Sequence, residues 1–406
     1  MQHNPHIFTT SRRRFAIAMV ASALAGCGHA PFHAPDTGQK TQADASPPAL
    51  PCTDPASFRL LGETRWGLDV QFAGVPVGGL SSIDYNTADD RYYLVSDDRS
   101  AHDSARFYTA RIHYDAGGLH SVQLDEARYL GAPDGQPYAS RRTARAGIAV
   151  PDPEALRVLP GSQRLAWSSE GDFARGFGPE VNEATLDGRW QQAWPLPPQL
   201  QLPANKGSST GPRNNMTLEG MAIGDDQKTL WLAMEGALKQ DGPLPARGLP
   251  GGPLRITQYD LATRQPQRQI AYVPDALPLD NLTLPLVAVN GVSEILADGP
   301  KHLLVLERSY VLGTGFSVRL YRISTETTDT LAMDALVPGQ FEPAAKTLLL
   351  DFAQAGLQTV DNIEGMTWGP RLASGERVLL LVSDNNFNPA EVTQFVALAE
   401  TPSCSR

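Results

Sequence analysis

The chain has 406 residues, of which 41% are hydrophobic, and a formal net charge of −10 at pH 7. The first 26 residues contain three arginines and no acidic residue, so the rest carries 31 basic against 44 acidic side chains. Nucleic acid is excluded as a partner, because phosphate binding needs a basic surface. An acidic body of this kind suits metal cations, or basic groups on a ligand.

The N-terminus has the features of an export signal. A charged segment, Ser11–Phe15 (SRRRF), precedes a short apolar stretch from Ala16 to Ala25. That stretch is too short to span a bilayer and is typical of a signal peptide over residues 1–26. The charged segment resembles the twin-arginine signal, with an ordinary secretory signal as the alternative. The following Leu24–Cys27 (LAGC) resembles a lipobox, in which the cysteine becomes lipidated.

Residues 27–51 are rich in Pro, Ala, Gly and polar residues and cannot bury a core, so we predict a flexible tether. We expect the mature protein to be a monomer in the bacterial cell envelope, facing the periplasm at the outer membrane. Its membrane contact would be the lipid on Cys27 alone. The alternative is a plain signal peptide in which Cys27 is coincidental.

Two further cysteines, Cys52 and Cys404, lie at the two ends of the segment 52–406, which we expect to fold. Export would place them in an oxidising compartment. If the fold is a closed ring its ends meet, and the two cysteines could form a disulfide. The alternative is a pair of free thiols.

One sequence unit recurs five times at intervals of about 65 to 75 residues. In each copy an apolar run, a polar turn and a second apolar run are flanked by small or acidic residues. Such runs predict a β-hairpin with both flanking residues at the same end, and the interval fits one four-stranded blade with its loops. The copies span residues 79–99, 152–172, 215–236, 290–309 and 361–386.

Weaker segments with alternating apolar and polar residues follow four of the hairpins and predict outer strands. They cover residues 105–115, 251–261, 316–325 and 390–400. The last of these leaves its blade one strand short, and residues 58–72 can supply that strand from the N-terminus. Residues 341–356 are the best candidate for a helix, within a loop.

The repeat motifs resemble those of the phytase-like family, whose name refers to an esterase-like activity. They are GLSSIDYN with YYLVSDDR, NMTLEGMAI, NGVSEIL, and DNIEGMTWG with LLLVSDNNF, between residues 58 and 400. The resemblance implies a β-propeller and a calcium-dependent hydrolase of phosphate esters or related esters. We therefore predict an all-β fold, a single β-propeller of five or six four-stranded blades closed by an N-terminal strand. Six is the number in the phytase propellers.

A propeller gathers equivalent positions of its blades around one channel, so the flanking acidic residues are expected to converge. The first positions are Glu154, Glu219, Glu294 and Glu364, with Ser81 in the first copy; the second are Asp97, Glu170, Glu235, Glu307 and Asp384. Nine carboxylates would repel one another unless a cation or an arginine shared the site. We predict Ca²⁺, which prefers oxygen ligands.

In this hypothesis the first set provides catalytic ligands or bases, and the second set binds the metal together with Asn386. Asp384, Asn386 and Asn388 are spaced like the start of a calcium loop, although Pro389 replaces the expected glycine. The alternative is structural, with each glutamate accepting hydrogen bonds from a neighbouring blade or an arginine.

Arg99, Arg213 and Arg308 lie beside the repeats and could bind the anionic group of a small-molecule ester, with Lys206 nearby. They could equally neutralise the acidic ring. Ser209 lies in a G-x-S-x-G pattern, but its proline-rich flanks do not predict the strand and helix of a nucleophile elbow. The sequence thus predicts a metal-dependent ester hydrolase, with a non-catalytic ligand-binding or scaffold propeller as the alternative.

Overall fold

The computed structural model describes residues 51–205, 207–278 and 288–404. Their regular structure is β-strand, apart from two short 3₁₀ helices, Pro198–Leu200 and Phe352–Gln354. No helix within these ranges is long and apolar enough to cross a membrane. The predicted signal peptide, Cys27 and most of the tether lie outside the described residues.

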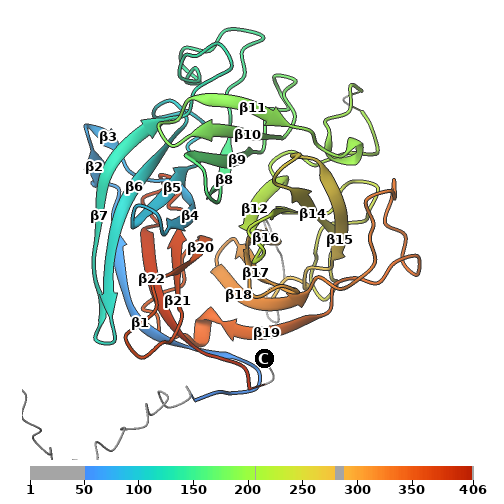
Figure 1. Ribbon diagram of the computed structural model, residues 1–406. Coiled ribbons are helices and arrows are strands. Elements are labelled where there is room, and N and C mark those ends of the chain that lie inside the picture. Colours follow the sequence, from blue (N-terminus) through green and yellow to red (C-terminus); the bar gives the residue numbers. More distant parts are fainter. Residues whose placement is uncertain (1–50, 206, 279–287, 405–406) are drawn as a thin grey trace, which may run out of the picture. The chain divides into compact units, whose positions relative to one another are not determined.

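The strands form five four-stranded antiparallel sheets arranged as the blades of a propeller, as predicted (Figure 1). The first blade contains β4 (Leu80–Asn86), β5 (Arg91–Ser96), β6 (Arg106–Asp115) and β7 (Gly118–Tyr129). The second contains β8 (Pro153–Val158), β9 (Arg164–Ser169), β10 (Glu180–Thr185) and β11 (Trp190–Trp194). The third contains β12 (Leu218–Ile223), β13 (Thr229–Met234), β14 (Leu254–Asp260) and β15 (Pro266–Tyr272).

The fourth blade contains β16 (Ala288–Ala297), β17 (His302–Val311), β18 (Gly315–Ser324) and β19 (Lys346–Asp351). The fifth contains β20 (Ile363–Gly369), β21 (Val378–Ser383), β22 (Thr393–Thr401) and, as its outermost strand, β1 (Ser57–Trp66). A small hairpin of β2 (Gln71–Phe72) and β3 (Val75–Pro76) leads into the first blade. Five is therefore the number of blades in the part of the chain that the structure describes.

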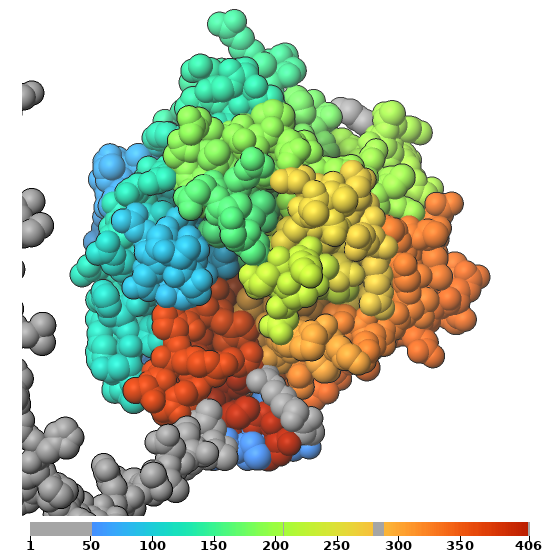
Figure 2. Space-filling view, viewed as in Figure 1, coloured from blue at the N-terminus to red at the C-terminus, as the bar shows by residue number. Residues whose placement is uncertain are grey.

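The hydrophobic core lies between adjacent blades. Tyr93 and Phe107 of the first blade, for example, belong to one buried cluster with Leu165 and Trp167 of the second. The second strand of each hairpin is covered on both faces, which explains its continuous apolar run: every residue of β21 is buried. The space-filling view shows the blades packed side by side around the ring (Figure 2).

Each hairpin of the repeat is the inner half of a blade, and its first strand lies nearest the propeller axis. β20 packs against β4, so the five first strands form a ring. The starts of these strands therefore surround one end of the channel, and the turns of the hairpins surround the other end.

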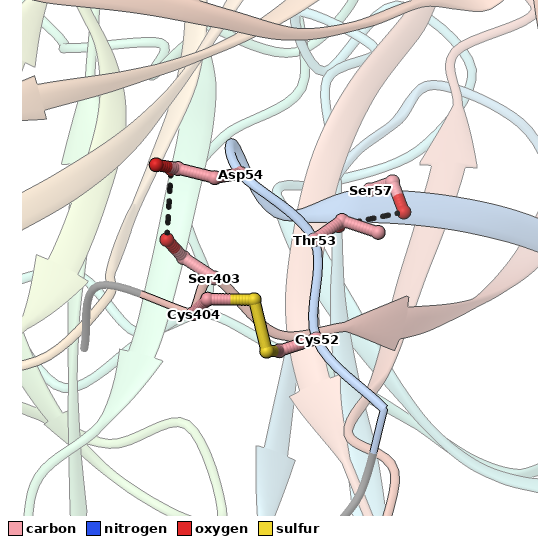
Figure 3. Close-up of a disulfide and its surroundings, with 6 residues drawn as sticks. All are labelled: Cys52, Thr53, Asp54, Ser57, Ser403 and Cys404. Carbon is pink, nitrogen blue, oxygen red and sulfur yellow. Dashed lines mark hydrogen bonds between the residues drawn. A yellow bond between two sulfur atoms is a disulfide. The ribbon is translucent and has the colours of Figure 1, made fainter.

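The two cysteines form the predicted disulfide, Cys52–Cys404, across 352 residues of sequence (Figure 3). The Thr53 amide donates to the Pro402 carbonyl at 2.9 Å, and the Cys404 amide donates to the Thr53 carbonyl at 2.9 Å. The neighbouring strand β1 runs antiparallel to β22, from Ser57 opposite Thr401 to Trp66 opposite Thr393. The N-terminal strand thus completes the sheet that the last repeat begins.

The α-helix expected within residues 341–356 does not form. Lys346–Asp351 forms β19 on the edge of β18, and Phe352–Gln354 adds a single 3₁₀ turn. Pairing with the free edge of β18 outweighs the helical preference of this short segment.

Candidate metal centre at one end of the channel

A β-bulge interrupts the first strand of each blade, where the register shifts by one residue. A bulged residue leaves the ladder, so its side chain takes a new direction. The residues at this position are Ser81, Glu154, Glu219, Ser293 and Glu364. Three of the four predicted glutamates are therefore equivalent.

The second position follows the last residue of the second strand in four blades. There a backbone amide donates to the residue just before the first strand, at 2.6 Å from Asp97 to the Gly79 carbonyl and 2.9 Å from Glu170 to the Asp152 carbonyl. The equivalent residues are Asp97, Glu170, Glu235 and Asp384. In the fourth blade, Arg308 pairs with Gly291 and occupies this position.

The fourth blade therefore departs from the predicted alignment by one residue. Val292 pairs with Glu307, and Glu294 pairs with Leu306. Glu294 and Glu307 are neighbours of the ring positions and do not occupy them. The apolar pattern did not reveal this, because a bulge adds a residue without changing the character of the strand.

Both displaced glutamates are buried and hydrogen-bonded. Glu294 accepts from Arg157 Nη2 at 2.6 Å and from the Met221 amide at 2.8 Å. Glu307 accepts from Lys346 Nζ at 2.8 Å and from Asn290 Nδ2 at 3.1 Å. These contacts link Glu294 to the second and third blades and hold Glu307 within the fourth blade.

The remaining carboxylates, joined by one residue that the sequence did not single out, form what we call the acidic cluster. The added residue is Asp152, two positions before Glu154. Its signal in the sequence was the D-P-E at the start of the second repeat. The cluster consists of Asp97, Asp152, Glu154, Glu170, Glu219, Glu235, Glu364 and Asp384.

Two overlapping groups in this cluster have the spacing of metal ligands. One oxygen each from Asp97, Asp152 and Glu154 lies within 4.8 Å of the others, and the same holds for Glu154, Glu170 and Glu219. Oδ1 of Asp97, Oδ1 of Asp152 and Oε2 of Glu170 are buried without a hydrogen-bond partner among the described residues. Buried oxygens without donors fit a hard divalent cation, which takes about six to eight oxygen ligands when it is Ca²⁺.

Burial raises the pKa of most groups in the cluster. The pKa of Glu170 rises to about 8, because burial disfavours the charged form and Glu235 is nearby. Burial and the neighbouring carboxylates also raise the pKa of Glu154 and Glu219 well above the usual range. Full ionisation of the cluster is therefore unfavourable without a balancing cation.

Arg308 balances only one side of the cluster. Its Nη2 lies 2.8 Å from Glu364 Oε1 and 3.5 Å from Glu235 Oε1. The side chain is only 13% exposed and bridges the third and fifth blades. Both groups with metal-ligand spacing lie on the other side, toward the first, second and third blades.

Arg99 also forms an ion pair with the cluster, with Nε 3.1 Å from Asp152 Oδ2 and 40% of its side chain exposed. Arg213 instead donates to the carbonyls of Ala237 and Gly242, at 3.0 and 2.8 Å. These bonds fix the loop after β13, so the structure does not join Arg213 to the cluster.

Asn386 is exposed, and its side-chain amide donates to Glu391 Oε2 at 2.9 Å. Its backbone amide donates to Asp384 Oδ1 at 2.7 Å, which orients that carboxylate. Ser209 lies in a bend, in neither a strand nor a helix, and Lys206 lies outside the described residues. The acidic cluster is thus the site that most, but not all, of the predicted residues share.

Of the comparisons with known proteins, the match to a family model bears on the fold. The chain matches the phytase-like family, described as "esterase-like activity of phytase", over residues 75–387. No curated protein matches the sequence.

Solved structures that are similar have low identity. A protein of unknown function from Dyadobacter fermentans has 12% identity and a TM-score of 0.38, covering 84% of this chain and 87% of its own. Hydrazine synthase of Kuenenia stuttgartiensis has 10% identity and a TM-score of 0.33, with coverages of 82% and 89%. A bifunctional GH43-CE protein of Bacteroides eggerthii has 9% identity and a TM-score of 0.37 over 79% of this chain, which spans 33% of that protein.

Proposed function

Because this chain belongs to the phytase-like family, we propose that it is a divalent-cation-dependent hydrolase of phosphate esters or related esters, with Ca²⁺ as the cation. The observation that carries the proposal is the pair of overlapping carboxylate groups joined by Glu154. Three buried oxygens of these groups, on Asp97, Asp152 and Glu170, have no hydrogen-bond donor among the described residues and are available to a cation.

The residues that would hold the cation are Asp97, Asp152, Glu154, Glu170 and Glu219. A cation bound there would polarise the ester and lower the pKa of a bound water. The chain's own groups supply the remaining functions. The half-exposed Arg99 can bind the anionic part of a substrate.

Glu364 is suited to proton transfer. Burial raises its pKa to about 7, although Arg308 opposes the shift. A carboxyl group with a pKa near neutral pH can both accept and donate a proton during hydrolysis. It lies beside the candidate ligands rather than within either group of three.

The activity is tested by a hydrolysis screen with phytate, simple phosphomonoesters and short acyl esters, with added Ca²⁺ and with a chelator. We expect turnover that the chelator abolishes. Glu154→Gln should lower calcium affinity by at least about tenfold, because even outer-shell partners of a metal contribute about 10- to 100-fold. Glu326→Gln, at an exposed ion pair with Lys301, is the control and should leave both properties unchanged.

A non-catalytic ligand-binding or scaffold propeller is the alternative outcome of this screen. It would be supported by no turnover on any substrate together with a melting temperature that Ca²⁺ does not change. Turnover that persists in the chelator would contradict the cation dependence but not the hydrolase.

We also propose that the protein is a lipoprotein of the cell envelope, facing the periplasm at the outer membrane. The LAGC sequence ending at Cys27 supports this, and the disulfide Cys52–Cys404 is consistent with an oxidising compartment. Cys27→Ser should move the protein from the membrane fraction to the soluble fraction. Unchanged fractionation would show that Cys27 is not the anchor.

A further inference from the structure

Arg99 has a fixed backbone and a partly free side chain. Both Arg99 and Ser100 adopt left-handed backbone conformations, with φ of 49° and 50°. Their loop is held by the ion pair between Asp98 and Arg106, whose side chains are each 1% exposed. The Arg141 amide also donates to the Ser100 carbonyl at 2.8 Å. The backbone therefore holds Arg99 at the edge of the acidic cluster, while 40% of its side chain stays exposed.

Asp152 is shared between this guanidinium and the candidate cation site. Its Oδ2 lies 3.1 Å from Arg99 Nε, while its Oδ1 is buried and has no hydrogen-bond partner among the described residues. The same carboxylate belongs to the ligand group with Asp97 and Glu154. A divalent cation and the Arg99 guanidinium would thus be attracted to the same negative charge and repel each other.

Arg308 provides the contrast within the same molecule. It is 13% exposed and contacts two carboxylates, Glu364 and Glu235. Arg99 is three times as exposed, and Asp152 is the carboxylate it contacts within salt-bridge distance. Of these two arginines, Arg99 is the more exposed and pairs with fewer carboxylates, so its guanidinium can turn toward solvent once another cation compensates Asp152.

We propose that Arg99 is a tethered counter-ion that a bound divalent cation releases from Asp152, so that it becomes the group that binds the anionic part of the substrate. This inference rests on the proposed function. A cation between Asp97, Asp152 and Glu154 cancels the negative potential that holds the guanidinium. The N–H groups of the Arg99 guanidinium are then free to donate to a phosphate or carboxylate oxygen at this end of the channel.

The proposal requires that cation and anion bind cooperatively. Each ligand makes the other's site more available, and by linkage the coupling is equal in both directions. Removing the guanidinium should make the cation bind more tightly, because no internal charge then has to be displaced. The same change should abolish the coupling.

The test is calorimetric titration of the protein with Ca²⁺, with and without methylphosphonate, which resembles a phosphate ester but has no ester bond to hydrolyse. In the unmodified protein, we expect methylphosphonate to tighten Ca²⁺ binding by about 5- to 150-fold, the usual range of such couplings. Arg99→Gln should bind Ca²⁺ more tightly without the anion and show no tightening with it. Arg111→Gln is the control, because Arg111 is 53% exposed and paired with Asp125 on the first blade.

Two results would overturn the role of Arg99 alone: unchanged or weaker Ca²⁺ binding by Arg99→Gln, or a methylphosphonate effect that survives in that variant. Absence of Ca²⁺ binding in both the unmodified protein and Arg111→Gln would instead overturn the proposed cation site. The melting temperature of each variant separates these results from misfolding.

Discussion

The carboxyl groups of the acidic cluster determine how the metal-free protein should respond to pH. Burial raises the pKa of Glu170 to about 8, and that of Glu235 and Glu364 to about 7, from the ordinary value of 4.5. These groups keep their protons in the folded state over a range in which the unfolded chain has lost them. Linkage then requires the free energy of unfolding to fall as pH rises through that range.

We therefore predict that the chelated protein melts at a lower temperature at pH 8 than at pH 5. The stabilising effect of the raised pKa values is complete below about 4.5 and is lost as pH rises through 7 to 8. Glu183 affects the stability in a different, more acidic pH range. Burial raises its pKa, but hydrogen bonds from Arg264 and Arg164 outweigh burial and hold it at about 2, so its contribution is lost only below pH 4.5.

Melting curves between pH 5 and pH 8, with chelator and with Ca²⁺, measure this effect. Glu170→Gln should flatten the decline, and added Ca²⁺ should restore stability at pH 8. If the chelated protein is equally stable across this pH range, the carboxyl groups of the cluster do not have the raised pKa values from which the prediction follows.

At the scale of elements, the five first strands are joined by one buried ion pair on the propeller axis. Arg157, from β8, donates to the Ile83 carbonyl of β4 at 3.3 Å and to the Met366 carbonyl of β20 at 3.3 Å. Its partner Glu294, from β16, accepts from the Met221 amide of β12 at 2.8 Å. The pair therefore contacts every blade.

We predict that Arg157→Met destabilises the protein by about 3–5 kcal/mol, because it leaves the Glu294 carboxylate buried and unpaired. Replacing both residues, as Arg157→Met with Glu294→Met, should recover much of this loss. Denaturant unfolding of the single and double variants measures both effects. A single variant as stable as the unmodified protein would show that Glu294 accepts a proton at little cost.

Glycines after two of the bulges show why the repeats contain E-G. A Cβ on Gly220 would lie 2.8 Å from the Ile295 amide nitrogen, and one on Gly365 would lie 2.9 Å from the Ile83 amide nitrogen. Each glycine thus lets the backbone of the neighbouring blade approach closely. The bulge aims the glutamate toward the cluster, and the glycine allows the next blade to pack there.

At the scale of the whole molecule, the disulfide and β1 join the two ends of the folded segment. The cysteines pair across 352 residues, beside the strand that completes the fifth blade. Such a long loop loses much conformational freedom in the unfolded state when it is cross-linked. The ends that meet there lie away from the acidic cluster, because β22 runs from the cluster end at Thr393 to the opposite end at Thr401.

We predict that replacing both cysteines, as Cys52→Ala with Cys404→Ala, lowers the free energy of unfolding by up to about 5 kcal/mol. The unmodified protein under reducing conditions should behave like this variant. Thermal melting with and without reductant measures the difference, and non-reducing mass spectrometry establishes the bond. Two free thiols in the mature protein would contradict this account of the chain ends.

The sequence by itself determined the all-β class, the five hairpins and the pairing of Cys52 with Cys404. These features depend on apolar runs, turn residues and the positions of the chain ends, all of which can be read from short stretches of sequence. It also placed most of the carboxylates, because the repeat carries them at fixed distances from the apolar runs. The predicted residues that the structure brings together in the cluster are Asp97, Glu154, Glu170, Glu219, Glu235, Glu364 and Asp384.

Only the tertiary structure decided what surrounds those carboxylates. In the fourth blade the bulge places Ser293 and Arg308 at the ring positions, and Glu294 and Glu307 each lie one residue away from them. Asp152 joins the cluster because the start of the second blade lies beside Asp97 of the first blade. The spacing within one repeat does not show this contact between two blades. A one-residue bulge leaves the apolar pattern intact, yet it decides which side chains meet on the axis, and only the packed ring reveals it.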